Sequence, residues 1–125
     1  TTLFRSQLAV VCDYGDMGIT QVVRGRDLLD STPRQLYLYG LLGLTPPEFY
    51  HVPLLLAPDG RRLSKREHDL DMGALRERFT PAELTGRLAF WAGLTDRPEP
   101  VSPAELAASF DWANVPRGDI TVEQF

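Results

Sequence analysis

The segment FYHVPLLLAPDGRRLSKR, residues 49–66, carries the pattern that decides the fold. Residues 49–56 form an apolar run of strand length, and Pro58 and Gly60 stand where a type I turn prefers them. Four basic residues then fall within the six positions 61–66. Anionic ligands of an α/β sheet bind beyond the carboxyl ends of its strands, where such a loop would lie. The segment therefore favours an α/β protein, and its basic loop is either a solvated turn, which charge alone favours, or a phosphate-binding loop.

Upstream of this segment, the sequence predicts two more strands. Residues 8–12 are a continuous apolar and β-branched run, typical of a strand that is buried on both faces of a parallel sheet. Residues 19–23 form the second candidate, and the turn-rich residues 13–18 separate the two.

A helix is predicted between these strands and the run at 49–56. Thr32 is suited to be its N-cap, Pro33 takes the first helical position and Gln35 completes a capping box. Gly43 is its natural end. Residues 1–66 therefore predict parallel strands with a crossover helix, in the order β-β-α-β.

Beyond residue 66 the character of the sequence changes to helical. The same capping pattern recurs at residues 80–83 and 102–105, where Thr or Ser is followed by Pro, Ala and Glu. Apolar side chains at helical spacing follow each of these starts. We expect residues 67–125 to form a small helical appendage packed on the α/β part.

Composition sets limits on the class of protein. The 125 residues are 43% hydrophobic and 24% charged, as in an ordinary globular domain. The net charge of −4 arises entirely within residues 80–125, and Lys65 is the only lysine among thirteen basic residues. A single cysteine excludes an internal disulfide, and no apolar stretch reaches the ~20 residues of a membrane span. We expect a cytoplasmic protein with no membrane partner.

Several segments occur together in one order and spacing, and they resemble the glutamyl-tRNA synthetase group of class I aminoacyl-tRNA synthetases. The resemblance covers residues 4–66 and rests on QLAVV (7–11), MGIT (17–20), VVRG (22–25), DSTPRQ (30–35), YHVPL (50–54) and PDGRRLSKR (58–66). It implies that residues 1–66 are the C-terminal half of a Rossmann-type catalytic domain, with residues 67–125 as its helical appendage.

Within this resemblance, residues 62–66 look like the family's KMSKS loop, which acts on the phosphates of ATP. The resemblance implies ATP, with Mg²⁺, as a substrate and assigns catalysis to Lys65 and Ser64. Arg62 stands where the family has its first lysine. The nucleotide contacts implied are Arg62, Leu63, Ser64, Lys65, Arg66 and Leu55.

The resemblance also assigns a glutamate site. Arg24 matches the family's arginine that contacts substrate glutamate, although an ion pair with Asp27 or Asp30 is an equally good reading of the sequence. Ser6 stands where the family has a tyrosine that contacts glutamate. Asp13 and Asp27 match positions near the nucleotide and the acceptor end.

The remaining polar candidates favour structural roles. His51 lies in an apolar strand and is expected to be a hydrogen-bonded structural histidine, and His68 has no second ligand near it in sequence. Cys12 is expected to be a small buried thiol. No metal site is predicted in the chain.

The family's HIGH motif is absent from these residues, so we expect half of a nucleotide site and no adenylation by this chain alone. Its partner would be the N-terminal half of the same protein. The stretch 102–120 resembles glutamyl-Q tRNA(Asp) synthetases, which transfer glutamate to queuosine of tRNA(Asp). Two alternatives stay open: a discriminating glutamyl-tRNA synthetase truncated before its anticodon-binding domain, and a non-catalytic module that binds RNA or protein.

Overall fold

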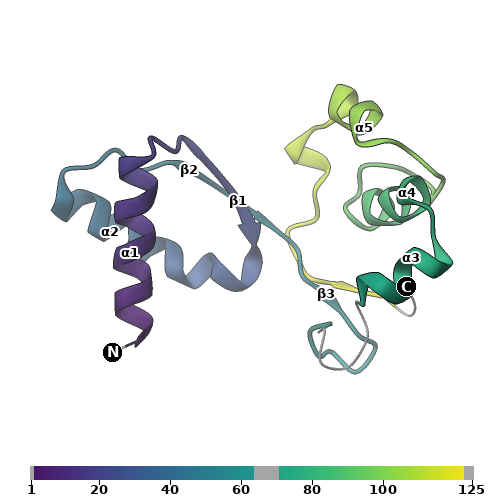
Figure 1. The fold of residues 1–125 in the computed structure, drawn as a ribbon, viewed down its shortest axis with the longest axis horizontal. Coiled ribbons are helices and arrows are strands. Elements are labelled where there is room, and N and C mark those ends of the chain that lie inside the picture. Colours follow the sequence, from purple (N-terminus) through teal and green to yellow (C-terminus); the bar gives the residue numbers. More distant parts are fainter. Residues whose placement is uncertain (1, 64–70, 123–125) are drawn as a thin grey trace. The chain divides into compact units, whose positions relative to one another are not determined.

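A computed structural model of the chain describes residues 2–63 and 71–122 (Figure 1). The chain divides into two compact units, residues 1–52 and residues 53–125. This division falls earlier than the boundary at residue 66 that the sequence suggested. Within the described residues, no helix is long and apolar enough to cross a membrane.

The first unit is built around a parallel pair of strands. Its elements are helix α1 (Thr2–Asp16), strand β1 (Gln21–Gly25), the 3-10 helix η1 (Arg26–Ser31), helix α2 (Thr32–Leu42) and strand β2 (Glu48–Val52). β1 and β2 run parallel, with η1 and α2 as the crossover between them (Figure 1). The predicted parallel strands with a crossover helix are thus confirmed for this unit.

The core of this unit lies between α1, α2 and β2. Val11 of α1 packs with Leu38 and Tyr39 of α2, and Phe49 of β2 lies against them. Val11 and Tyr39 are the most deeply buried large side chains, at 0% and 1% exposure. Together these contacts hold both helices against the strand pair.

The strand expected at residues 8–12 is wrong, because these residues lie within α1. A short apolar run fits a buried strand and a helix equally well, so its tertiary partners decide between them. In the helix, Gln7 and Val11 are four residues apart on the face turned toward α2, and both are buried. Leu8 on another face remains 36% exposed.

Helix α2 ends as predicted but begins differently. Gly43 adopts the left-handed conformation with φ of 65°, and the amide of Leu44 donates back to the carbonyl of Tyr39. At the other end, Ser31 precedes the helix and no side chain caps it. The predicted capping role of Thr32 is therefore wrong, since η1 leads directly into α2 and the Thr32 hydroxyl turns to Arg24 instead.

The apolar run at 49–56 is two strands rather than one. β2 ends at Val52, and strand β3 (Leu55–Leu56) belongs to the second unit. Pro53 has no amide hydrogen for a ladder, which explains why pairing stops there. After β3 the predicted turn is present: the Gly60 amide donates to the Ala57 carbonyl at 2.8 Å.

The second unit combines short helices with a small parallel sheet. Its described helices are α3 (Met72–Arg78), α4 (Pro81–Trp91), α5 (Pro103–Ser109) and the 3-10 helix η3 (Trp112–Asn114). Both predicted capping boxes are confirmed, at Thr80 and at Ser102. Strand β4 (Ile120–Thr121), which the sequence did not reveal, pairs in parallel with β3. Residues 67–125 are therefore not purely helical.

Candidate functional site

A cluster of polar side chains lies at the carboxyl end of the β1–β2 pair. Arg24 is the fourth residue of β1 and stands opposite His51 of β2 in the parallel register. The crossover from β1 brings η1 and the first turn of α2 to the same end of the strands. This is the edge at which parallel α/β sheets bind ligands.

The guanidinium of Arg24 is held by acceptors from three elements. Its Nε donates to Nε2 of His51 at 3.1 Å, and its Nη1 donates to Oε1 of Gln35 at 2.7 Å. Its Nη2 donates to Oγ1 of Thr32 at 2.7 Å and, more weakly, to the carbonyl of Leu28 at 3.4 Å. The Arg24 side chain is thereby fixed in both position and plane.

An aromatic ring supports the guanidinium from its face. The Cζ atom of Arg24 lies 4.5 Å from the centroid of the Phe49 ring, within the range of a cation–π contact. The Phe49 ring in turn stacks on His51, with ring centroids 6.5 Å apart and an angle of 21° between the planes. Edge and face contacts together leave the guanidinium little rotational freedom.

None of the contacts that the described residues make with Arg24 involves a carboxylate. The ion pair with Asp27 or Asp30, which the sequence left open, is therefore not formed in this structure. Partial burial lowers the pKa of Arg24, because a cation is less stable away from water. The charge of Arg24 is thus partly desolvated and faces neutral acceptors.

His51 is hydrogen-bonded, as expected, and its partners define its protonation. An arginine Nε can only donate, so Nε2 of His51 must be an acceptor. Thr32 Oγ1 lies 3.2 Å from the same nitrogen. Burial, with the charge of Arg24 as a second cause, lowers the pKa of His51. The imidazole is therefore neutral, with its proton on Nδ1.

Behind Arg24 lies a pair of buried amides that the sequence reading missed. Gln35 donates from Nε2 to Oε1 of Gln7 at 2.6 Å, and Gln7 donates from Nε2 to Oγ of Ser31 at 3.2 Å. Gln35 is 3% exposed. A signal was available, because Gln35 precedes Leu38 and Tyr39 by three and four residues and so shares their buried face.

The other predicted site residues are spread over both units. Ser6 and Asp13 are exposed on α1, and Asp27 is exposed on η1. In the second unit Leu55 is half-buried in β3, where its carbonyl accepts from the Leu63 amide at 3.2 Å.

The predicted ATP loop is described only in part. Arg62 is exposed and forms an isolated antiparallel bridge with Leu56, so the chain folds back on β3 after the turn. Ser64, Lys65 and Arg66 lie outside the described residues. In the parts of the chain that the structure covers, no three His, Cys, Asp or Glu side chains form a metal-binding group.

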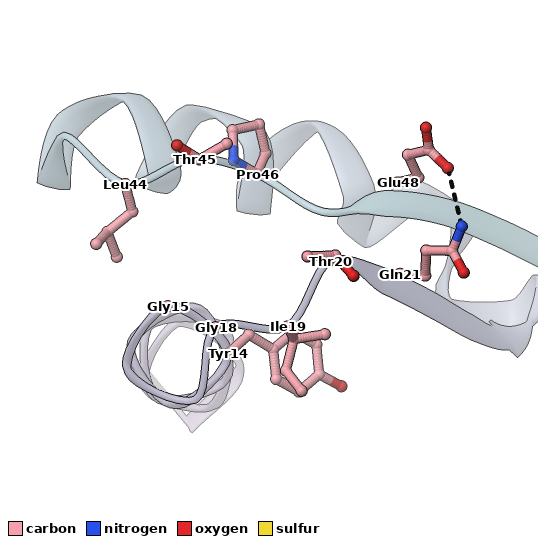
Figure 2. A pocket seen from close by; sticks show the side chains of 10 residues that line it. All are labelled: Tyr14, Gly15, Gly18, Ile19, Thr20, Gln21, Leu44, Thr45, Pro46 and Glu48. Atoms are coloured by element: carbon pink, nitrogen blue, oxygen red, sulfur yellow. Dashed lines mark hydrogen bonds between the residues drawn. The ribbon is translucent and has the colours of Figure 1, made fainter.

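A cavity of about 510 Å³ opens at the opposite end of the strand pair (Figure 2). Gln21 and Glu48, the first residues of β1 and β2, line it and are joined by a hydrogen bond of 3.3 Å. Tyr14 and Ile19 line it from the end of α1 and the segment that follows. No predicted site residue lines this cavity, whereas Arg24 lies at the other end of β1. We therefore take the carboxyl end of the strands as the candidate site.

A comparison with known protein families identifies the class of protein to which the chain belongs. Residues 6–119 match the family described as tRNA synthetases class I (E and Q), catalytic domain. Since the match spans most of the chain, the chain belongs to this family.

Curated relatives narrow the comparison within the family. The chain is 51% identical over 117 residues to a glutamyl-Q tRNA(Asp) synthetase of Symbiobacterium thermophilum, covering 93% of this chain and 36% of that protein. It is 50% identical over 115 residues to a protein of the same name from Nitratidesulfovibrio vulgaris, covering 91% of this chain and 36% of the relative. The chain therefore spans about a third of the length of these relatives.

The chain is also similar to solved structures of tRNA ligases. A glutamate tRNA ligase from Elizabethkingia meningosepticum, crystallised in complex with its amino acid, matches with a TM-score of 0.74 and 29% sequence identity. The match covers 92% of this chain and 27% of that one. The chain is therefore similar by structure, as well as by sequence, to members of this family.

Proposed function

We propose that this chain is part of an ATP-dependent ligase that activates glutamate as its adenylate and transfers it to tRNA. The acceptor we favour is queuosine of tRNA(Asp), which places the enzyme in the cytoplasm with its tRNA. The observation that carries this proposal is the partly buried guanidinium of Arg24 at the carboxyl end of β1, whose hydrogen-bond partners among the described residues are neutral. Such a group suits the recognition of a substrate carboxylate.

Glutamate is the amino acid we assign because the relatives at about half identity carry it in their names. Arg24 would contact one of its carboxylates. Ser6, on α1, stands where the family's tyrosine would be, and its hydroxyl is our second candidate for a glutamate contact. Asp13 and Asp27 stay candidates for contacts with the nucleotide or the acceptor end.

The reaction of glutamate with ATP would also need the segment after β3. We propose that Lys65 and Ser64 act on the phosphates of ATP, bound with Mg²⁺, and that Arg62, Leu63, Arg66 and Leu55 contact the nucleotide. A flexible ammonium can follow a phosphate whose charge develops during adenylation. Residues 1–66 would then form the C-terminal half of a Rossmann-type domain, with 67–125 as its appendage.

The proposal requires residues outside this chain. The HIGH-motif half of the nucleotide site would come from the N-terminal part of the same protein, so the 125 residues alone should not form the adenylate. Glutamate-dependent exchange of pyrophosphate into ATP, measured on the intact gene product and on residues 1–125, tests this. We expect exchange only with the former, and a folded intact protein without exchange would favour the non-catalytic alternative.

The role of the loop has its own test. Replacing Lys65→Ala should lower the exchange rate of the intact protein by roughly a hundred- to thousandfold, the usual loss when one donor to developing charge is removed. Arg87→Ala, in helix α4, removes one positive charge far along the sequence and serves as the matched control. An unchanged rate in Lys65→Ala would remove this lysine from the site.

A glutamyl-tRNA synthetase is the second candidate, because the matching solved structures bear the names of glutamate-specific tRNA ligases. Charging of tRNA(Asp) with and without queuosine, beside tRNA(Glu), separates the two. Transfer to queuosine-containing tRNA(Asp) alone is the expected result. Charging of tRNA(Glu) would instead assign the second candidate.

A further inference from the structure

The orientation of the amide of Gln35 follows from its partners. Arg24 can only donate, so the Gln35 atom that faces it at 2.7 Å must be oxygen. The nitrogen of Gln35 then faces Gln7, whose facing atom must also be oxygen, and the Gln7 nitrogen reaches Ser31. Ser31, Gln7, Gln35 and Arg24 therefore form one chain of hydrogen bonds with a single direction.

This chain connects three elements to β1. Gln7 belongs to α1, Ser31 to η1 and Gln35 to α2. Gln7 and Gln35 are 9% and 3% exposed, and a buried amide without partners is costly, so each link keeps the next in place. The position of the Arg24 guanidinium thus depends on side chains that lie behind it.

The neutrality of Gln35 matters as much as its position. A glutamate there would place a carboxylate at 2.7 Å from Nη1 and would neutralise Arg24 internally. With glutamine, the guanidinium is oriented but keeps its full charge for an incoming anion. Partial desolvation strengthens the attraction of that anion.

The donors of Arg24 are almost fully used before any ligand binds. Of its five N–H groups, one on Nε, one on Nη1 and two on Nη2 have acceptors among the described residues. The acceptor of the second Nη2 hydrogen, the Leu28 carbonyl at 3.4 Å, is the weakest. One hydrogen on Nη1 has no acceptor among the described residues and one on Nη2 has only this long contact, so each terminal nitrogen keeps a donor for a ligand.

We propose that Gln35, braced by Gln7, is a positioning residue that presents the two terminal nitrogens of Arg24 to a carboxylate of the substrate while leaving the arginine charge uncompensated. This inference rests on the proposed function, in which Arg24 binds glutamate. It adds that Arg24, the residue that would contact glutamate, needs Gln35 as a neutral hydrogen-bond acceptor.

The test uses glutamate-dependent ATP–pyrophosphate exchange by the intact gene product. Gln35→Glu should raise the KM for glutamate at least about tenfold, because the new carboxylate competes with the substrate for Arg24. The KM for ATP should stay within about twofold of the parent. The thermal midpoint should fall, because Gln7 loses its hydrogen-bond donor, so the KM values are compared at a temperature where both proteins are folded. Gln35→Met, similar in size but without an acceptor, should raise the KM for glutamate less than Gln35→Glu does.

Gln21→Glu is the matched control. It introduces the same charge at the first residue of β1, at the opposite end of the strand from Arg24, where it replaces the exposed hydrogen bond to Glu48. We expect its KM for glutamate to equal that of the parent. If Gln35→Glu misfolds, the comparison of Gln35→Met with the parent carries the test.

The outcomes separate this inference from the proposed function. If Arg24→Gln raises the KM for glutamate while both Gln35 variants leave it unchanged, the positioning role is overturned and the function stands. If the Gln35 variants alter the KM for ATP and for glutamate equally, their role is merely structural and the inference is again overturned. An Arg24→Gln enzyme with normal KM, or a folded parent without exchange, would overturn both.

Discussion

At the scale of single residues, Tyr39 has an unusual environment. It is 1% exposed, and its hydroxyl has no hydrogen-bond partner among residues 2–63 and 71–122. Burial raises the pKa of Tyr39, so the phenol is neutral. Because an unpaired buried hydroxyl costs free energy, Tyr39→Phe should raise the free energy of unfolding by up to about 1 kcal/mol.

Urea denaturation followed by far-UV circular dichroism measures this effect. Tyr37→Phe is the control, because Tyr37 lies on the same helix and is 69% exposed, and we expect it to leave stability unchanged. A Tyr39→Phe protein that is less stable than the parent would show that the hydroxyl is bonded in solution.

His51 predicts a pH dependence at the same scale. Its pKa is lowered in the folded protein, whereas the unfolded chain titrates near the ordinary value of about 6.5. The unfolded state therefore binds the proton first, and stability that is complete above about pH 6.5 falls as the pH falls below it. Protonation would also remove the acceptor for Arg24 Nε.

Denaturation midpoints at pH 7.5 and 5.5 test this, with His51→Gln as the reference because glutamine keeps an acceptor but does not titrate. The parent should lose more stability than the variant over this interval. Equal losses in the two proteins would mean that His51 does not titrate differently on folding.

At the scale of elements, helix α4 depends on a glycine. A Cβ at Gly86 would collide with the carbonyl oxygen of Glu99, because the segment after α4 crosses the helix there. The Val101 amide donates to the Ala82 carbonyl at 3.1 Å and holds that crossing. Gly86→Ala should therefore lower the free energy of unfolding by roughly 1–3 kcal/mol, although alanine itself favours a helix.

Gly40 in α2 provides the opposite case. A Cβ there meets no atom within 4 Å, so Gly40→Ala should stabilise the protein by up to about 1 kcal/mol through helix propensity alone. Chemical denaturation followed by circular dichroism compares both variants with the parent. Equal effects of the two substitutions would contradict the close crossing at Gly86.

At the scale of the whole chain, strand β4 pairs with β3 and so joins the C-terminal segment to the rest of the second unit. The Ile120 and Val122 amides donate to the carbonyls of Leu54 and Leu56, both at 2.9 Å, and Val122 is 4% exposed. Removing residues 119–125 should lower the stability of this unit by at least about 2 kcal/mol, the value of one buried valine with its ladder bonds.

Tryptophan fluorescence reports this loss, because Trp91 and Trp112 both belong to the second unit. The fluorescence transition should move to lower urea concentration in the shortened chain. The reference is a chain that lacks only residues 123–125, because it keeps β4 and Val122. An unmoved transition in the longer deletion would mean that β4 adds little stability.

The helices that begin at Pro81 and Pro103 were predictable because their signals are local. A hydroxyl and a glutamate three residues apart cap the helix without any tertiary contact, and both boxes form as predicted. The helical conformation of residues 8–12 was not predictable in this way, because a short apolar segment takes its conformation from its packing partners. Strand β4, two residues long, exists only because β3 pairs with it.

In the candidate site, too, some features follow from local sequence and others only from tertiary packing. The sequence by itself determined the family and the end of α2 at Gly43, since these rest on motifs and local chemistry, and it offered Arg24 as a candidate. Only the tertiary structure decided that Arg24 meets neutral acceptors instead of Asp27 or Asp30 and that Gln7 braces Gln35. Residues 7 and 35 stand 28 positions apart, and only the packing of α1 on α2 brings their amides together in a space that excludes water.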